Sequence, residues 1–283
     1  MTTAIGIDVG SGVIKTALFR VGENKTEWLS RWDGRIRQRD AHTLVEESID
    51  SVLHEAGLQR EQINYIASTG EGETLKGTTG HFYSMTTHAR GAIYLNPQAR
   101  AVLDIGALNG RAISIDEQSK VLTYRMTSQC ASGSGQFLEN IARYLGIGQD
   151  EIGSLSLQST TPEKVSGICA VLAETDVINM VSRSIAPCDI LRGIHESMAD
   201  RLLKLLKSIG VTQGVVMMTG GLALDIGLVK AIQDGMDKQH MGTKVAAHAD
   251  SIYAGAIGAA LWGAFRYEKL KQKGILPDVP KAS

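Results

Sequence analysis

The chain opens with Ile5-Gly6-Ile7-Asp8-Val9-Gly10-Ser11-Gly12, an apolar run that ends in an aspartate and a glycine-rich turn. Ile14-Lys15-Thr16-Ala17-Leu18-Phe19 follows and predicts a returning strand, so that the segment forms a β-hairpin. The pattern recurs at Val102-Leu103-Asp104-Ile105-Gly106-Ala107-Leu108-Asn109-Gly110, with Asp104 in the place of Asp8 and Gly106 in that of Gly10. A second apolar run at 112–115 completes this hairpin. We therefore expect two copies of one structural unit.

A second pair of segments supports this duplication. Residues 63–70 end a strand on Thr69-Gly70, and residues 215–221 end one on Thr219-Gly220-Gly221. Between these landmarks, apolar periodicity predicts helices at 41–56, 137–145, 170–184, 194–209 and 251–266. The last of these is dense in Ala and Gly, which indicates close packing against another backbone. We expect an α/β protein with a first lobe at 1–100, a second lobe at 101–250, and a C-terminal helix at 251–270 that returns to the first lobe.

Composition narrows the classes of function. The chain has 283 residues and is 43% hydrophobic, with 29 basic and 30 acidic residues that nearly cancel. This balance does not favour nucleic acid or an anionic membrane as a partner. The first residues lack the basic and apolar regions of a signal peptide, and no apolar run approaches the length of a membrane helix, so we expect a cytoplasmic protein. With three cysteines, a disulfide framework is not expected.

The two hairpins have the chemistry of a polyphosphate site. Glycines let backbone N–H groups approach phosphate oxygens, and carboxylates hold Mg²⁺ through its retained waters. We therefore expect Asp8 and Asp104 to share a Mg²⁺-nucleotide across a cleft. Backbone groups of the glycine turns would bind the phosphates, and Lys15 could add a positive charge. The predicted phosphate-binding residues are Gly10, Ser11, Gly12, Lys15 and Gly106.

Competing motifs account for these glycines less well. Either hairpin alone could be a plain turn, but matching motifs in matching order across two halves are hard to obtain by chance. A Walker loop needs glycine before its lysine, where this chain has Ile14. A dinucleotide fingerprint would need a third glycine after Gly133 and Gly135, and Leu138 stands there.

The motifs Asp8-Val9-Gly10-Ser11, Asp104-Ile105-Gly106 and Thr219-Gly220-Gly221-Leu222-Ala223 resemble those of the actin, Hsp70 and sugar-kinase superfamily. The resemblance spans nearly the whole chain. It implies a duplicated, two-lobed ATPase fold related to ribonuclease H. It also implies that Gly220, Gly221 and Leu222 contact the adenosine.

Two cysteines lie where helices are expected to begin. Cys130 stands in a small-residue loop before the predicted helix at 137–145, and Cys169 opens the one at 170–184. The helix dipole favours a thiolate in this setting, although a buried structural thiol is the ordinary alternative. We expect Cys188 to be structural, in a turn beside Pro187. We assign no role to His88.

The segments beginning at Cys130 and Cys169 resemble the two cluster motifs of a known ATPase family. Cys-Ala-Ser-Gly-Ser-Gly-Gln-Phe-Leu-Glu and Cys-Ala-Val-Leu-Ala-Glu-Thr-Asp are similar to motifs of the 2-hydroxyacyl-CoA dehydratase activators and benzoyl-CoA reductase ATPases. Ser68-Thr69-Gly70 and residues 87–92 also fit. The resemblance implies one [4Fe–4S] cluster shared by two subunits. Simple counting agrees, because such a cluster takes four thiolates and this chain has two in the helix-start setting.

The same resemblance implies a role in electron transfer. In it, ferredoxin reduces the shared cluster, ATP binding and hydrolysis change the angle between the lobes, and electrons pass to subunits that bind an aromatic acyl-CoA. Residues 107–109 depart from the common Gly-Gln-Asp of the activators and resemble the D-type ATPase subunits of ATP-dependent benzoyl-CoA reductases. Leu108 and Asn109 remove polar groups there, so the site either turns over slowly or chiefly signals occupancy to a partner.

Two other classes of protein remain open from the sequence. A sugar or acetamidosugar kinase of the same fold would phosphorylate a hydroxyl group, with the cysteines incidental. A nucleotide-switched binding or filament-forming protein would need neither cluster nor small substrate. Two copies of this chain would also supply four cysteines, so a homodimer and a heteromer both remain open.

Overall fold

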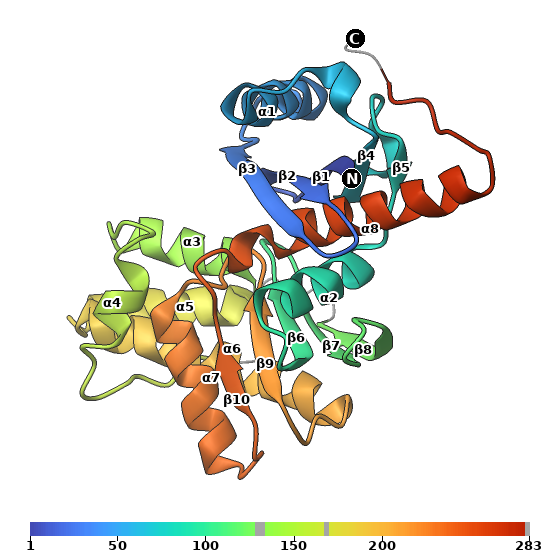
Figure 1. Ribbon diagram of the computed structural model, residues 1–283. Coiled ribbons are helices and arrows are strands. Elements are labelled where there is room, and N and C mark those ends of the chain that lie inside the picture. Colours follow the sequence, from blue (N-terminus) through green and yellow to red (C-terminus); the bar gives the residue numbers. More distant parts are fainter. Residues whose placement is uncertain (128–133, 167–169, 281–283) are drawn as a thin grey trace. The chain divides into compact units, whose positions relative to one another are not determined.

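The computed structural model describes residues 1–127, 134–166 and 170–280. Its contacts divide the chain into two compact units (Figure 1). Unit 1 comprises Met1–Pro97, Gln118–Lys120 and Ile252–Ser283, and unit 2 comprises Gln98–Glu117 and Val121–Ser251. The C-terminal segment therefore belongs to the same unit as the N-terminal hairpin.

Unit 1 is built on a five-stranded sheet in the order β3-β2-β1-β4-β5. β1 pairs antiparallel with β2 and parallel with β4, which makes β1 the central strand. Its elements are β1 (Thr2–Val9), β2 (Val13–Val21), β3 (Thr26–Arg35), α1 (Ala41–Ala56), β4 (Tyr65–Gly70), β5 (Gly80–His81), α2 (Ser84–Leu95) and α8 (Ala254–Gln272).

Unit 2 repeats this topology with a five-stranded sheet in the order β10-β9-β6-β7-β8. Its central strand β6 pairs antiparallel with β7 and parallel with β9, as β1 does with β2 and β4. The predicted duplication and the α/β class are therefore confirmed. Its elements are β6 (Ala99–Ile105), β7 (Gly110–Ile115), β8 (Val121–Met126), α3 (Gly135–Tyr144), α4 (Ile152–Ser156), α5 (Ala170–Ser182), α6 (Pro187–Ser208), β9 (Val215–Thr219), α7 (Ile226–Lys238) and β10 (Lys244–Ala246).

The helices of unit 1 cover both faces of its sheet (Figure 1). Because side chains alternate along a strand, Ile5, Ile7 and Val9 of β1 pack with α1 on one face. Ala4 and Gly6 turn to the other face, where they meet α8. Every residue of β1 is buried. Asp8, which lies near the end of this buried strand, is thereby held on a rigid support.

The small residues of α8 allow very close packing. A Cβ atom added to Gly6 of β1 would overlap the backbone of Ala256 and Ala260 in α8. One added to Gly258 would overlap the carbonyl oxygen of Thr87 in α2. The close approach to another backbone that was expected from the Ala and Gly content of this helix is confirmed.

This packing predicts that Gly258→Ala destabilises the protein. Alanine in a helix interior is intrinsically better than glycine by up to about 1 kcal/mol. The overlap with a backbone oxygen that cannot rotate away costs about 1–3 kcal/mol or more, so overpacking wins. The midpoint of urea unfolding should fall. Lys271→Ala, at an exposed position of the same helix, should change stability by less than about 0.5 kcal/mol. A midpoint for Gly258→Ala at or above that of the parent would contradict the packing.

The outcome for the predicted helix boundaries differs from helix to helix. α7 was not predicted, although Asp225 caps its start. α1 spans Ala41–Ala56 as predicted, because Asp40 accepts a hydrogen bond from the Thr43 amide at its start and Gly57 ends it in the left-handed conformation. α6 begins at Pro187, seven residues before the predicted start at 194. The turn expected at Cys188 is wrong, because proline is well suited to the first position of a helix. Cys188 is half-buried in the first turn of α6, so a third cysteine also lies at a helix start and the expected count of two is wrong.

Candidate functional site

The first hairpin places Asp8 opposite a cation. Asp8 is the penultimate residue of β1, and its partner across the antiparallel ladder is Lys15 of β2. The amide of Gly10 donates to the carbonyl oxygen of Val13 at 3.0 Å, which closes the turn. Asp8 and Lys15 are both buried, whereas Ser11 and Gly12 at the tip are exposed. The tip therefore offers backbone groups to a ligand, with one carboxylate and one amine behind it.

The second hairpin repeats this arrangement. Asp104 is the penultimate residue of β6 and pairs across the ladder with Arg111 of β7. Nη2 of Arg111 lies 2.6 Å from Oδ2 of Asp104, and the Gly106 amide donates to the Asn109 carbonyl at 2.9 Å. Sequence reasoning missed Arg111. The signal was present, because the aspartate and the cation are seven positions apart in both hairpins.

A Thr-Gly pair lies beside each aspartate. In the parallel ladders, Asp8 is level with Thr69 and Asp104 with Thr219. The glycines that follow, Gly70 and Gly220, have φ angles of 71° and 83°, which favour glycine. A Cβ atom at Gly70 would lie 3.1 Å from Oδ1 of Asp8, and one at Gly220 would lie 2.5 Å from Oδ1 of Asp104. Each carboxylate thus sits in a cradle that a larger residue would fill.

Asp8 also meets the start of α8 and a histidine of α2. A Cβ atom at Gly255 would lie 2.6 Å from Oδ2 of Asp8, so only glycine allows the carboxylate to approach this helix. The positive end of the helix dipole favours a negative charge there. Nε2 of His88 lies 3.9 Å from the same oxygen. His88 was assigned no role from the sequence, which carries no local signal for a contact made between distant segments.

In unit 2, the second hairpin contacts two other predicted motifs. Its Gly106 and Ala107 carbonyl oxygens accept hydrogen bonds from the amides of Gly135 and Gln136, at 3.0 and 2.9 Å, at the start of α3. Leu222 donates its amide to the carbonyl of Ile105 at 3.2 Å. A Cβ atom at Gly135 would lie 3.5 Å from Cγ of Leu222. The hairpin, the Gly220–Leu222 turn and the first turn of α3 are therefore contiguous.

The side chains and backbone groups of the two hairpins are of the kinds that bind a Mg²⁺-nucleotide. Each unit has a buried carboxylate behind a glycine turn, the donor that a partly hydrated Mg²⁺ takes in proteins. A Cβ atom built on Gly12 or Gly221 meets nothing within 4 Å in the described parts of the chain, so a ligand can reach the backbone there. The shared Mg²⁺ across the hairpins stays a prediction.

The predicted cluster ligands, Cys130 and Cys169, lie outside the described residues. The described helix α5 begins at Ala170, immediately after Cys169, and α3 begins at Gly135, five positions after Cys130. Over residues 1–127, 134–166 and 170–280, no group of three or more His, Cys, Asp or Glu side chains forms a metal site. Within the same ranges, no helix has the length and apolar character needed to cross a membrane.

Comparison with known proteins identifies relatives over the full length of the chain. The D subunit of benzoyl-CoA reductase from Thauera aromatica is 66% identical over 274 residues, which cover 97% of each chain. The activator of 2-hydroxyisocaproyl-CoA dehydratase from Clostridium difficile, solved with bound ADPNP, superposes with a TM-score of 0.85 at 29% identity and covers 100% of both chains.

A more distant structure shows the fold alone. The ethanolamine utilization protein EutJ from Carboxydothermus hydrogenoformans has a TM-score of 0.60 at 15% identity, covering 93% of this chain and 90% of its own. The actin and Hsp70-like fold expected from the phosphate motifs is confirmed. A model of the BadF/BadG/BcrA/BcrD ATPase family matches residues 5–263. The fold and the presence of one such hairpin in each unit agree with this match, which covers most of the chain. The chain belongs to the BadF/BadG/BcrA/BcrD ATPase family.

Proposed function

We propose that this chain is an ATP-binding subunit of a benzoyl-CoA reductase and couples ATP to low-potential electron transfer. The 66% identity to the D subunit of such an enzyme supports the choice of enzyme. The observation that supports coupling between ATP and electron transfer is a contact within unit 2. Two carbonyl oxygens of the second hairpin accept hydrogen bonds from the first turn of α3. That helix begins within the motif that starts at Cys130, so a ligand at Gly106 would act directly on the segment that follows the cysteine.

In this proposal, Asp8 and Asp104 hold the Mg²⁺ of Mg-ATP through water. The backbone amides of the glycine turns bind the phosphates, helped by Lys15, and Gly220, Gly221 and Leu222 contact the adenosine. The burial of both carboxylates and the glycine cradles around them support these roles. Arg111 adds a second cation, equivalent in position to Lys15.

Cys130 and Cys169 would hold half of a [4Fe–4S] cluster, and a homologous ATPase subunit would supply the other two thiolates. The donor chemistry fits, because each cysteine comes shortly before a helix start, where the dipole favours a thiolate. When bound, the cluster would supply one-electron transfer from ferredoxin to the subunits that bind the aromatic acyl-CoA. This chain would control when that transfer occurs, through nucleotide binding at the second hairpin and the attached start of α3.

The second hairpin differs between this chain and the common activator pattern. Leu108, at its tip, is 53% exposed, so an apolar side chain stands where a polar group could orient water. We propose that ATP turns over slowly in this subunit, or that its occupancy chiefly signals to the partner subunit.

The proposal predicts the colour and composition of the native complex. Purified anaerobically from native extract, the complex that contains this chain should be brown, with broad visible absorption and at least about four iron atoms per pair of ATPase subunits, the number that the shared cluster takes. Electron flow from reduced ferredoxin to an aromatic acyl-CoA should require Mg-ATP. Omitting Mg²⁺ or ATP is the control. A colourless, iron-free preparation that phosphorylates a sugar would favour the kinase alternative instead.

A further inference from the structure

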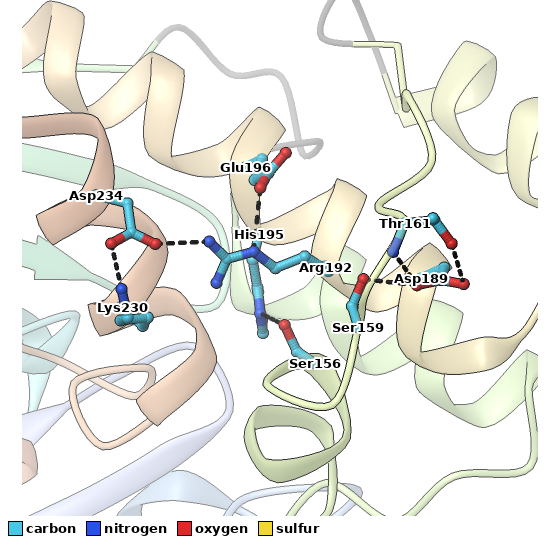
Figure 2. Close-up of polar contacts among 9 residues, drawn as sticks. All are labelled: Ser156, Ser159, Thr161, Asp189, Arg192, His195, Glu196, Lys230 and Asp234. Atoms are coloured by element: carbon cyan, nitrogen blue, oxygen red, sulfur yellow. Dashed lines mark hydrogen bonds and ion pairs between the residues drawn. The ribbon is translucent and has the colours of Figure 1, made fainter. Parts of the chain in front are cut away.

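A buried histidine joins three helices of unit 2. His195 of α6 is 0% exposed, and its Nδ1 atom lies 2.8 Å from Oγ of Ser156 at the end of α4 (Figure 2). Its other ring nitrogen, Nε2, lies 3.2 Å from Oδ2 of Asp225, just before α7. Both ring nitrogens therefore face a polar group, each on a different helix.

The backbone around this histidine is shaped to admit it. A Cβ atom at Gly227 would lie 2.6 Å from Nδ1 of His195. One at Gly153 of α4 would lie 2.9 Å from Oδ1 of Asp225. Any larger residue at either position would push the helices apart. Gly153 and Gly227 thus allow the three helices to approach closely enough for His195 to contact Ser156 and Asp225.

The serine, histidine and aspartate do not form a hydrolytic triad. Ser156 is 1% exposed and His195 is fully enclosed, so a substrate cannot reach the hydroxyl group. A catalytic nucleophile must lie within reach of the bond that it attacks. The network therefore has a structural role, which depends on what Asp225 is attached to.

Asp225 is the last residue of the loop that contains the Gly220–Leu222 turn. Its side chain caps α7 by accepting from the Leu228 amide at 3.0 Å, and its own amide donates to the carbonyl of Leu222 at 3.1 Å. The middle of the loop is fastened to β6 by the bond from Leu222 to Ile105. Burial opposes ionisation of Asp225, but its contacts with His195 hold the pKa of this carboxyl below its usual value. The loop is therefore fixed at Leu222 by β6 and at Asp225 by His195.

We propose that His195 is a positioning residue for nucleotide binding: it holds Asp225 so that the loop at 220–225 keeps the shape that receives the adenosine. This inference rests on the proposed function, because it assumes that the loop binds the nucleoside. The proposal predicts different effects on the binding of the nucleoside and on the binding of the phosphates. Loss of His195 should weaken binding of the nucleoside part of a nucleotide far more than binding at the phosphate hairpins, because Leu222 fastens the hairpin side of the loop to β6 independently of His195.

The test compares Mg-ADP with Mg-tripolyphosphate, which lacks a nucleoside, by calorimetry on the folded full-length chain. His195→Leu keeps the apolar volume and removes both polar contacts. It should weaken Mg-ADP binding about 10- to 100-fold, the scale known for replacing residues that orient metal ligands. Mg-tripolyphosphate binding should stay within about twofold of the parent. His195→Gln, which can still donate to Asp225, should recover much of the ADP affinity.

Two further variants keep the test decisive. Asp225→Asn should reproduce the loss of ADP affinity, because asparagine still caps α7 but no longer offers His195 a charge. It also serves if His195→Leu fails to fold. Asp234→Asn is the matched control: it removes the charge from the 2.8 Å contact of Arg192 with Asp234, which joins the same two helices, α6 and α7, away from the loop (Figure 2). Its affinities for both ligands should equal those of the parent.

The outcomes separate the two hypotheses. Parental ADP affinity in folded His195→Leu or Asp225→Asn would overturn the positioning role. An equal loss for both ligands would also overturn it, because it would indicate general damage to unit 2. Failure of the parent chain itself to bind Mg-ADP would overturn the proposed function, on which the inference rests.

Discussion

Replacement of Cys130 or Cys169 by serine is expected to abolish the cluster shared by the two ATPase subunits and, with it, electron transfer to the acyl-CoA. A serine hydroxyl group does not replace the thiolate that iron–sulfur clusters take as ligand. A shared cluster that loses one of its four thiolates should not persist. Mg-ATP binding should be retained, because the phosphate hairpins use other residues. Iron and sulfide analysis of the anaerobic complex is the measurement, with ATP affinity determined in parallel.

Cys188→Ser is the matched control for these variants. Cys188 also lies in the first turn of a helix, α6, so it shares the dipole environment proposed for the other two cysteines. Only Cys130 and Cys169 belong to the cluster motifs, so iron content should be unchanged in Cys188→Ser. Unchanged iron and sulfide in both of the other variants would remove the cluster assignment and favour the kinase alternative.

Asp8→Asn and Asp104→Asn are expected to uncouple ATP from electron delivery. Asparagine preserves the shape of each carboxylate but removes the charge that holds Mg²⁺, which neutralises the phosphates and positions the γ-phosphoryl group. We expect Mg-ATP affinity to fall about 10- to 100-fold, or ATP-dependent electron flow to stop at retained affinity. Calorimetry with Mg-ATP and electron transfer from reduced ferredoxin are the two measurements.

Asp104→Asn is the sharper of the two variants. Relative to the common activator pattern, Leu108 removes a polar side chain and Asn109 removes a charge, and Arg111 lies 2.6 Å from the carboxylate that is lost. The exposed residues Asp50 and Asp150 supply matched controls, one for each unit, as Asp50→Asn and Asp150→Asn. Parental affinity together with parental electron flow in both site variants would show that the hairpins are plain turns and that the nucleotide acts elsewhere.

Some elements whose signals lie within a few residues could be predicted from the sequence, although α7 was missed despite its cap at Asp225. α1 has its predicted bounds because Asp40 and Gly57 cap its two ends locally. Both hairpins and the strands that end in Thr-Gly were found because a glycine turn between apolar runs is a short-range pattern. The start of α6 was missed because Pro187 was interpreted as a turn, although proline is also favoured at the first position of a helix.

The sequence by itself determined the duplicated hairpins, the aspartate in each, the glycine turns and the family to which these motifs point. All of these depend on backbone preferences and spacing along a short stretch of chain. Only the tertiary structure decided which side chains meet: Gly255 of α8 beside Asp8, Gly135 against Gly106 and Leu222, and His195 between Ser156 and Asp225. These partners are far apart in the chain, and close packing of helices and strands brings them together. A contact of this kind leaves no periodic or local trace in the sequence, because its geometry depends on the packing of the whole unit.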